Sequence, residues 1–415
     1  MPRVKSRTIA KHYATLHPYD VVVYQENGHY YAKSASRLIC VDSPTSCLQE
    51  AVNYLSNGGR IYIKKGNYNI SNTVTVGPNI EIHGEATLIG PPDTTIINIK
   101  NARDVRIEKI TVLGGQHGIL VTNSQRVEIE GVRVLGSGLY GVYIYDSSLV
   151  DLLNSYIENT QECGIAVESY LTEVYGISIR NNKIINAGQS KRYCGNGIHL
   201  ESHRSITDVD IEGNYVNGAG LAGISVMTSQ RVGIRDNVIL NSGLDGVIII
   251  ATSYSKIIGN IIANNGRNNN AGYQNGIRID DPGVNPPSTY NIVAENVIIN
   301  NPGQAIVERG NANFNTIINN ITIGNGTPQV ITTGPNTVVI NTVGHVTRAS
   351  GRATIQANST SVTVNHGLTC TPSKVLVTPT TDVKAWVSNV TDTSLTINID
   401  VAQLSSVTVY WYAEC

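Results

Sequence analysis

The chain has 415 residues and a formal net charge of −1, which gives no electrostatic reason to expect a nucleic-acid partner. No apolar run is long enough to cross a bilayer, so the sequence predicts no membrane span. Thirty-nine glycines, 21 tyrosines and one phenylalanine accompany apolar residues that are mostly Ile and Val. This composition favours β-structure with many turns and few long helices.

The N-terminal segment, residues 1–41, is predicted to be a docking region. Its first 18 residues are polar and basic, as in an arm that binds another component, and lack the apolar stretch of a secretory signal peptide. The following stretch DVVVYQENGHYYAKS predicts two strands around Asn27-Gly28, a frequent hairpin turn.

Residues 43–57 carry the spacing of a short amphipathic helix. Ser43-Pro44 is a plausible helix start, and Gly58-Gly59 a plausible stop. The apolar positions that repeat at i, i+3, i+4 and i+7 are Leu48, Ala51, Val52 and Leu55. We expect this helix to cap a stack of strands, whose open end would otherwise expose unpaired backbone groups.

The middle of the chain, residues 42–345, is a repeat array. The pattern Gly-[Ile/Val]-x-[Ile/Val/Leu] recurs at intervals of 23 to 33 residues, and apolar residues alternate within each unit, which indicates strands. A unit of about 23 residues fits one coil of a parallel β-helix. The repeated glycines are Gly118, Gly141, Gly164, Gly197, Gly223, Gly246 and Gly276.

A second repeated position holds asparagine. The pattern [Ile/Val]-x-x-Asn-x-[Ile/Val] keeps step with the glycines. We expect these asparagines in turns, because Asn tolerates left-handed backbone angles, and their amides to form a ladder between coils. They are Asn182, Asn214, Asn237, Asn260 and Asn296.

The order of cap helix, double glycine and the strand RIYIKKGNYNI resembles the entrance of the pectate-lyase-like right-handed β-helix superfamily. The resemblance covers roughly residues 40–345. That superfamily includes polysaccharide lyases, glycoside hydrolases and the tailspikes of phages and archaeal viruses. The resemblance implies a right-handed coil and, if the chain is a spike, a homotrimer.

Residues 346–415 alternate in short runs such as SVTVNHG and SVTVYWYA, which predicts a small antiparallel β-sandwich. The segment resembles small β-domains at the tips of archaeal and viral surface proteins. Two interpretations stay open, a tip for binding or trimerisation and a plain cap on the solenoid.

Six cysteines predict three local disulfides, Cys40–Cys47, Cys163–Cys194 and Cys370–Cys415. None of the spacings is that of a zinc site, and His199 with His203 would converge on a metal only if they lay on a helix. We therefore expect no metal. Disulfides without a signal peptide suggest a hyperthermophile or a particle that leaves the cell by assembly or lysis.

The repeat register predicts two columns of side chains on one outer face, because residues alternate in and out along a strand. This arrangement places His199 and Glu201 in solvent, with loops of the longer repeats rising near residues 186–196 and 263–275. The first column is Leu120, Tyr143, Ala166, His199, Ser225, Ile248 and Arg278; the second is Thr122, Tyr145, Glu168, Glu201, Met227, Ile250 and Asp280. Tyr143, Tyr145, His199, Arg278 and Asp280 are the predicted glycan contacts.

Glu168 and Glu201 are the candidate catalytic residues, since they share a column on adjacent coils. Carboxyls about 5 Å apart suit retaining glycoside hydrolysis, and their repulsion would raise the pKa of one of them. A lyase would instead use Arg278 or His199 as base. The competing interpretation is that outward charges merely keep the solenoid soluble.

Comparison with the polygalacturonases of the superfamily weakens the enzyme interpretation. Their paired aspartates and Gly-His-Gly would fall where this chain has Gly195-Asn196 and Leu221-Ala222, and their lysine near GIRI is replaced by Asp280. No P-loop, nucleophile elbow or dinucleotide fingerprint occurs, so no cofactor is expected.

The sequence therefore favours a virion or cell-surface spike that attaches to host glycans through a rigid shaft and a C-terminal β-domain. Its expected location is extracellular or on a virion, with a particle component bound to the N-terminal arm. Outward Met227, Ile248 and Ile250 are candidates for the contact between three shafts. The alternative is an extracellular polysaccharide lyase or glycoside hydrolase that acts on an acidic glycan.

Overall fold

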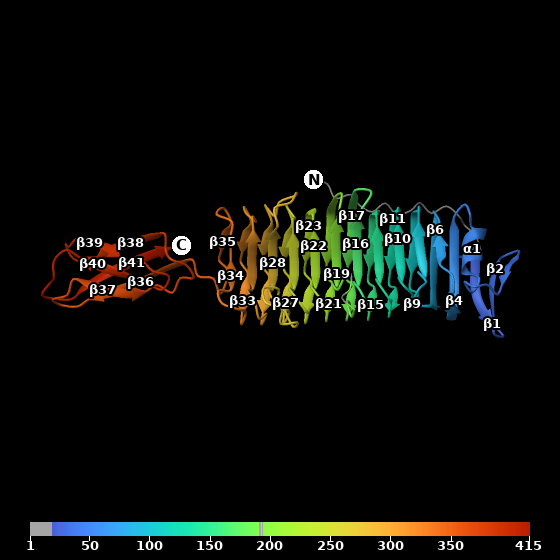
Figure 1. The fold of residues 1–415 in the computed structure, drawn as a ribbon, viewed down its shortest axis with the longest axis horizontal. Coiled ribbons are helices and arrows are strands. Elements are labelled where there is room, and N and C mark those ends of the chain that lie inside the picture. Colours follow the sequence, from blue (N-terminus) through green and yellow to red (C-terminus); the bar gives the residue numbers. More distant parts are fainter. Residues whose placement is uncertain (1–18, 191, 193) are drawn as a thin grey trace.

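The computed structural model of the chain describes residues 19–190, 192 and 194–415. It is a long shaft of stacked coils, with a smaller β-domain beyond the end opposite α1 (Figure 1). The predicted basic arm, residues 1–18, lies outside the described residues. The all-β, right-handed parallel β-helix with a C-terminal antiparallel domain is confirmed.

One side of the shaft is an eleven-stranded sheet, here called sheet B, in which every neighbouring pair is parallel. Each coil contributes one strand, so residues 22 to 33 positions apart in sequence become neighbours about 4.8 Å apart. The strands are β5 (Val74–Val76), β7 (Ile97–Lys100), β10 (Ile119–Thr122), β13 (Val142–Tyr145), β16 (Ile165–Ser169), β19 (Ile198–Ser202), β22 (Ile224–Met227), β25 (Val247–Ile250), β28 (Ile277–Asp281), β31 (Ile306–Gly310) and β34 (Val330–Ile331).

The remaining shaft strands form a 24-stranded sheet, sheet A, made of two parallel ladders and a terminal hairpin. The first ladder is β4 (Gly59–Asn69), β6 (Ile80–Gly90), β8 (Arg103–Glu108), β11 (Gln125–Glu130), β14 (Ser148–Leu153), β17 (Val174–Arg180), β20 (Ile206–Glu212), β23 (Ser229–Arg235), β26 (Lys256–Ile258), β29 (Ile292–Ala294), β32 (Thr316–Ile318) and β35 (Val338–Ile340). The second is β9 (Thr111–Gly114), β12 (Arg133–Leu135), β15 (Tyr156–Glu158), β18 (Lys183–Ile185), β21 (Tyr215–Asn217), β24 (Val238–Leu240), β27 (Ile261–Ala263), β30 (Val297–Ile299) and β33 (Ile321–Ile323).

The N-terminal hairpin is continuous with the shaft. β1 (Val21–Glu26) pairs antiparallel with β2 (His29–Ser34) through the turn at Asn27-Gly28, and β3 (Leu38–Val41) pairs with β2. β1 also pairs in parallel with β4. The described part of the predicted docking region is therefore built into the first coil.

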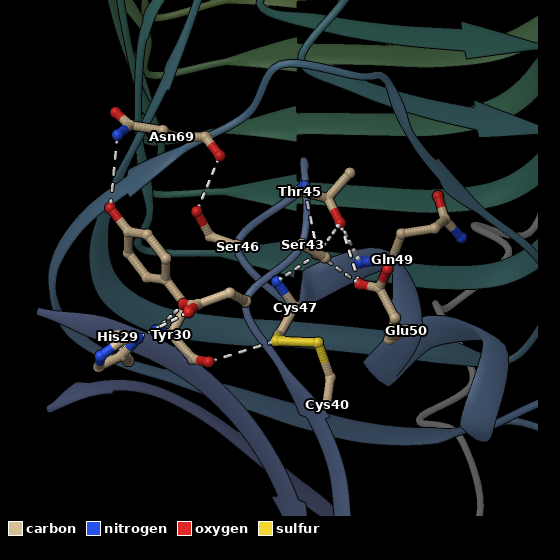
Figure 2. The surroundings of a disulfide bond; sticks show 11 residues. His29, Tyr30, Cys40, Ser43, Thr45, Ser46, Cys47, Gln49, Glu50 and Asn69 are labelled. Atoms are coloured by element: carbon tan, nitrogen blue, oxygen red, sulfur yellow. Dashed lines mark hydrogen bonds and ion pairs between the residues drawn. A yellow bond between two sulfur atoms is a disulfide. The ribbon is translucent and has the colours of Figure 1, made fainter.

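The cap helix α1 (Leu48–Tyr54) is shorter than the predicted 43–57. It starts late because Cys47 has a left-handed backbone and is bonded to Cys40, while Ser43 Oγ accepts a hydrogen bond from the Cys47 amide at 2.9 Å. Ser43 also donates to Glu50, which holds the turn onto the helix (Figure 2). Leu48, Ala51 and Val52 are buried over the end of the core, as the spacing predicts.

The asparagine ladder is formed, but its backbone differs from the expectation. The side-chain nitrogen of each asparagine donates to the side-chain oxygen of the asparagine on the next coil, at 2.9–3.1 Å. The ladder runs through Asn182, Asn214, Asn237, Asn260, Asn296 and Asn320. The left-handed residue is the one before each ladder asparagine, as at Asn181, Asp236 and Glu295. Two consecutive residues therefore have different roles in the turn: the first bends the chain, and the second forms hydrogen bonds with buried backbone groups.

The C-terminal domain consists of two three-stranded antiparallel sheets with a core of their own around Trp411 and Ile397. One sheet orders β36 (Arg348–Ile355), β41 (Val407–Glu414) and β38 (Lys374–Pro379); the other orders β37 (Ser361–Asn365), β40 (Ser394–Ile399) and β39 (Ala385–Ser388). All three predicted disulfides are formed. Across the described residues, no helix has the length and apolarity needed to span a membrane.

Candidate functional site

The predicted columns lie on the outer face of sheet B in the predicted register. Ala166 pairs with His199 and Glu168 with Glu201 on consecutive strands β16 and β19. Gly164 and Gly197 are likewise on consecutive coils, since the Gly197 carbonyl accepts a hydrogen bond from the Ile165 amide. Arg278 lies in the same column as Ile248. The spacing of the repeats alone therefore predicted correctly which residues pair on neighbouring strands of this face.

The expectation that His199 points into solvent is wrong, because its side chain is only 8 % exposed. The end of the loop before β19 packs against this face: Cys194 is bonded to Cys163, and Asn196 contacts the His199 ring. The rest of the first column from Ala166 to Arg278 is buried too, which removes Ile248 as an outward oligomer contact.

A first polar cluster, the His199 cluster, consists of Tyr143, Glu168, Asn196, His199 and Glu201. The Tyr143 hydroxyl donates to Glu168 Oε2 at 2.5 Å. The Asn196 amide lies 3.2 Å from Nδ1 of His199, and Nε2 of His199 lies 3.2 Å from Glu201 Oε2. Because the side-chain nitrogen of Asn196 can only donate, Nδ1 of His199 accepts and Nε2 carries the proton that is donated to Glu201.

The two candidate catalytic glutamates therefore each have a partner of their own. The hydrogen bond from His199 lowers the pKa of Glu201, and this outweighs the opposing effect of partial burial. Repulsion between two carboxyls was expected to raise the pKa of one of them, and for Glu201 the direction is the reverse. Tyr145, which precedes Glu168 in the second column, packs edge-on against Tyr143 with ring centres 5.7 Å apart.

A second polar cluster, the Arg278 cluster, contains Asp245, Tyr273, Asn275, Arg278 and Asp280. Arg278 donates from Nε to Asp245 at 2.8 Å and from an Nη atom to Asp280 at 2.7 Å, and its guanidinium lies 4.5 Å from the centre of the Tyr273 ring. Asn275 also donates to Asp245, at 2.7 Å. Two ion pairs and ring stacking make Arg278 a fixed cation, which is unsuited to the role of a general base.

The two clusters are separated along the shaft. Strands β22 and β25 lie between them and bring the half-buried Met227 and Ile250 to the second column. Three coil spacings of about 4.8 Å separate Glu201 from Asp280, so about 14 Å of face lies between these carboxylates. Only an extended ligand would contact both clusters.

A third column, which was not predicted, is formed by the residue before each repeat glycine and, in the following coil, by the residue before Ala305, which takes the place of the glycine there. Backbone hydrogen bonds between coils align these residues: His117, Tyr140, Cys163, Asn196, Ala222, Asp245, Asn275 and Gln304. Asn196 and Asp245 belong to it and orient His199 and Arg278. The signal was present in the sequence as position −1 of the glycine pattern, but its mixed residue types concealed the column.

His117 sits at the N-terminal end of this column, with its ring centre 5.4 Å from that of Tyr140 and 5.6 Å from that of Tyr143. Burial lowers its pKa to about 4. The unfolded chain takes up this proton near pH 6.5, so the folded state loses stability as the pH falls from about 6.5 to about 4. We expect the loss to reach about 3 kcal/mol at the acid end of this window.

Urea denaturation of the wild type and His117→Phe at pH 7 and pH 4.5 measures this effect. The phenylalanine variant keeps an aromatic ring in the stack but has no proton to bind, so its stability should change less between the two pH values. His203→Phe removes an exposed histidine and serves as the control. Equal pH dependence in the His117→Phe variant and the wild type would contradict the assignment.

One further group of side chains has the donor atoms of a cation site. Glu108, Glu128 and Glu130 place carboxylate oxygens within 4.8 Å of one another on the outer face of sheet A. The Arg106 guanidinium already contacts all three, at 2.5–3.0 Å. This cation balances one of the three negative charges, and His83 Nδ1 also contacts Glu108 at 3.0 Å, so the group is explained as a surface ion-pair network.

Comparison with known proteins agrees with this architecture. Residues 95–188 and 170–343 match the family described as the right-handed β-helix region. The chain belongs to this family. No curated protein sequence matches it.

Solved structures of similar fold include two carbohydrate-active enzymes and a phage tailspike. The A-module of a mannuronan C-5 epimerase of Azotobacter vinelandii has a TM-score of 0.56 and 17% identity, covering 71% of this chain and 93% of its own. A tailspike of Pseudomonas phage phi297 has a TM-score of 0.53 and 10% identity, covering 89% and 91%. A thermostable α-1,3-glucanase from Streptomyces thermodiastaticus has a TM-score of 0.56 and 13% identity, covering 72% and 65%. At these identities the likeness concerns the fold alone.

Proposed function

We propose that this right-handed β-helix protein is an attachment spike that binds a glycan along the outer face of sheet B. The observation that carries the proposal is that the polar side chains of this face are fixed in advance. Glu168, Glu201 and Asp280 are each held by a hydrogen bond from a neighbouring side chain. A face that is ordered before binding loses little side-chain entropy when a ligand arrives.

The charge of the face favours a neutral glycan. Glu168, Glu201, Asp245 and Asp280 outnumber the cations Arg278 and Arg309 on these coils, so a polyuronate would meet net repulsion. Neutral sugars instead present hydroxyls that donate to carboxylates, and Tyr145 offers an aromatic surface beside them. This balance also disfavours the acidic glycan of the enzyme alternative.

The proposed location is extracellular or on a virion, which suits a chain with three disulfides. A tailspike is among the proteins that share the fold over most of their length. In the proposed spike, the described N-terminal coil lies toward the particle and the C-terminal domain toward the host. Three shafts would assemble side by side.

A glycan array with product analysis tests the proposal. The wild type should bind neutral glycans without releasing products, and Glu168→Gln/Glu201→Gln should bind at least about tenfold more weakly because two charged acceptors are lost. Glu158→Gln, an outward change on sheet A, is the matched control and should bind like the wild type. Failure of every glycan to bind, or equal binding by the double variant, would overturn it.

The second candidate function is a polysaccharide lyase or glycoside hydrolase. It is favoured by one observation, the orientation of the His199 imidazole between Asn196 and Glu201 one coil away from the Tyr143–Glu168 pair. An imidazole and a carboxylate in contact are the groups that proton transfer requires. Released products that disappear in the Glu168→Gln/Glu201→Gln variant would favour this function over the spike.

A further inference from the structure

The C-terminal domain contains both tryptophans of the chain, and their environments differ. Trp411 lies in the core of the domain and is 8% exposed, whereas Trp386 on the edge strand β39 is 48% exposed. The shaft does not cover Trp386, since the domain extends beyond the end of the shaft (Figure 1). Single exposed apolar residues are common on soluble proteins, so the surroundings of Trp386 decide whether its exposure has a function.

Trp386 shares its side of the sheet with small polar side chains. Alternate residues of β37, β40 and β39 pack into the core of the domain, and the residues between them face outward. In the fully described C-terminal domain, every other outward position of these three strands is Ser, Thr or Asn, and none is charged. The centre of this surface, here called the Trp386 face, consists of Ser361, Thr363, Trp386, Ser388, Thr396 and Asn398.

The other sheet of the same domain has the charged outer face that is usual for a soluble protein. Its outward positions include Arg348, Arg352, Lys374 and Glu414 around Tyr410. Protein surfaces normally mix charges of both signs over about a quarter to a third of their positions. The uncharged Trp386 face departs from this composition, and the need for solubility does not explain the difference between the two sheets.

The Trp386 face is arranged in rows across the sheet. Strand pairing places Trp386, Asn398 and Ser361 side by side. This row spans two strand spacings, about 10 Å, which is longer than one sugar ring. The side-chain nitrogen of Asn398 donates to Ser388 Oγ at 2.9 Å, so the row is tied to the next one.

The second row is also ordered without a ligand. The hydroxyls of Thr363 and Thr396 lie 3.1 Å apart and form a hydrogen bond. A hydroxyl donates one hydrogen bond and accepts others, so each still has hydrogen-bonding capacity for a ligand. Side chains that are held in place beforehand lose little entropy on binding.

We propose that the Trp386 face is a second glycan site, which binds a short segment of a neutral polysaccharide. The C–H face of a sugar ring packs on the indole, and the hydroxyls of the sugar exchange hydrogen bonds with the neighbouring Ser, Thr and Asn side chains. A neutral chain fits because the face offers no cation to a carboxylate. Just beyond the strand ends, Lys384 and Asp400 carry opposite charges that offset each other.

The site does not depend on glycan binding by sheet B. A flat face buries less of a ligand than a groove does, so we expect the Trp386 face to be the weaker site, with a Kd on the order of 1 mM. On a surface that displays many chains, two linked sites strengthen attachment more than either site alone.

Tryptophan fluorescence of the full chain reads this site alone, because both tryptophans lie in the C-terminal domain. Maltohexaose, cellohexaose and laminarihexaose are the neutral probes, and hexagalacturonate is the charged comparison. At least one neutral probe should shift the emission to the blue and reduce quenching by acrylamide, because a stacked sugar shields Trp386. Trp386→Phe should remove both changes, since Trp411 is buried.

Asn398→Ala should raise the Kd by about fivefold, because hydrogen bonds at the centre of the row are lost. Tyr410→Ala is the matched control, since it removes a 54% exposed ring from the other sheet, and it should keep the wild-type Kd. Far-UV circular dichroism checks that every variant folds.

Four outcomes would overturn the proposal: no response to any neutral probe, a response to hexagalacturonate instead, a response that persists in Trp386→Phe, or an unchanged Kd in Asn398→Ala. A failure of the shaft to bind on the glycan array would leave the fluorescence signal unaffected. The two glycan sites are therefore tested separately.

Discussion

Replacing Asn237 with alanine should lower the free energy of unfolding of the shaft by about 3 kcal/mol. The side-chain oxygen of Asn237 accepts hydrogen bonds from the backbone N–H and from the side-chain nitrogen of Asn214, at 2.9 and 3.0 Å. The side-chain nitrogen of Asn237 donates to the backbone carbonyl of Ile211 and to the side-chain oxygen of Asn260. Asn237 is fully buried, so water cannot replace these bonds without opening the coil. Urea denaturation followed by circular dichroism measures the change.

The matched control is Asn217→Ala. Asn217 also stacks on an asparagine of the next coil, since it accepts a hydrogen bond from Asn241 at 2.9 Å, but it faces outward. Water can satisfy both partners there, so the expected change is within about 0.5 kcal/mol. Equal destabilisation by the two substitutions would contradict the view that burial gives the ladder its strength.

The alignment of residues on consecutive coils could be predicted from the sequence, because the same residue pattern recurs once in each coil. One glycine per coil set the alignment, and this alignment correctly paired Glu168 with Glu201 and Cys163 with Cys194. No knowledge of side-chain packing was needed for these results. The cap helix followed equally from local spacing, although the Cys40–Cys47 bond shifted its start.

Burial on the outer face could not be predicted in the same way. Whether His199 meets water depends on where the irregular residues 186–196 fold, and those residues do not repeat. Ile248 was likewise expected to face outward, and it is buried for the same reason, while Met227 and Ile250 of the neighbouring column stay half-buried. In the last coils the outward apolar residues could be read from the sequence, because alternating runs give way to nearly continuous apolar runs in IVAENVII and TIINNITI, which indicates strands that are apolar on both sides.

Removing the C-terminal disulfide by Cys370→Ala/Cys415→Ala should destabilise the C-terminal domain by about 4 kcal/mol, because the bond closes a loop of 45 residues in the unfolded chain. A domain of this size has a small core, and such a loss shifts its Tm by roughly 20 °C. β41 is the central strand of its sheet, between β36 and β38, and the bond ties the end of that strand to Cys370. Calorimetry should show the transition of this domain moving down while that of the shaft stays in place.

Cys40→Ala/Cys47→Ala is the comparison, because the same chemistry closes a loop of only 7 residues at the other end of the molecule. Its expected cost is about 2 kcal/mol, and it should appear in the transition of the shaft, since Cys47 caps α1 over the first coil. The size of each loss therefore tests the effect of loop length, and the transition in which the loss appears tests the location of the bond. If both lowered a single common transition by the same amount, shaft and C-terminal domain would unfold as one unit, and the independence that their separate cores suggest would be refuted.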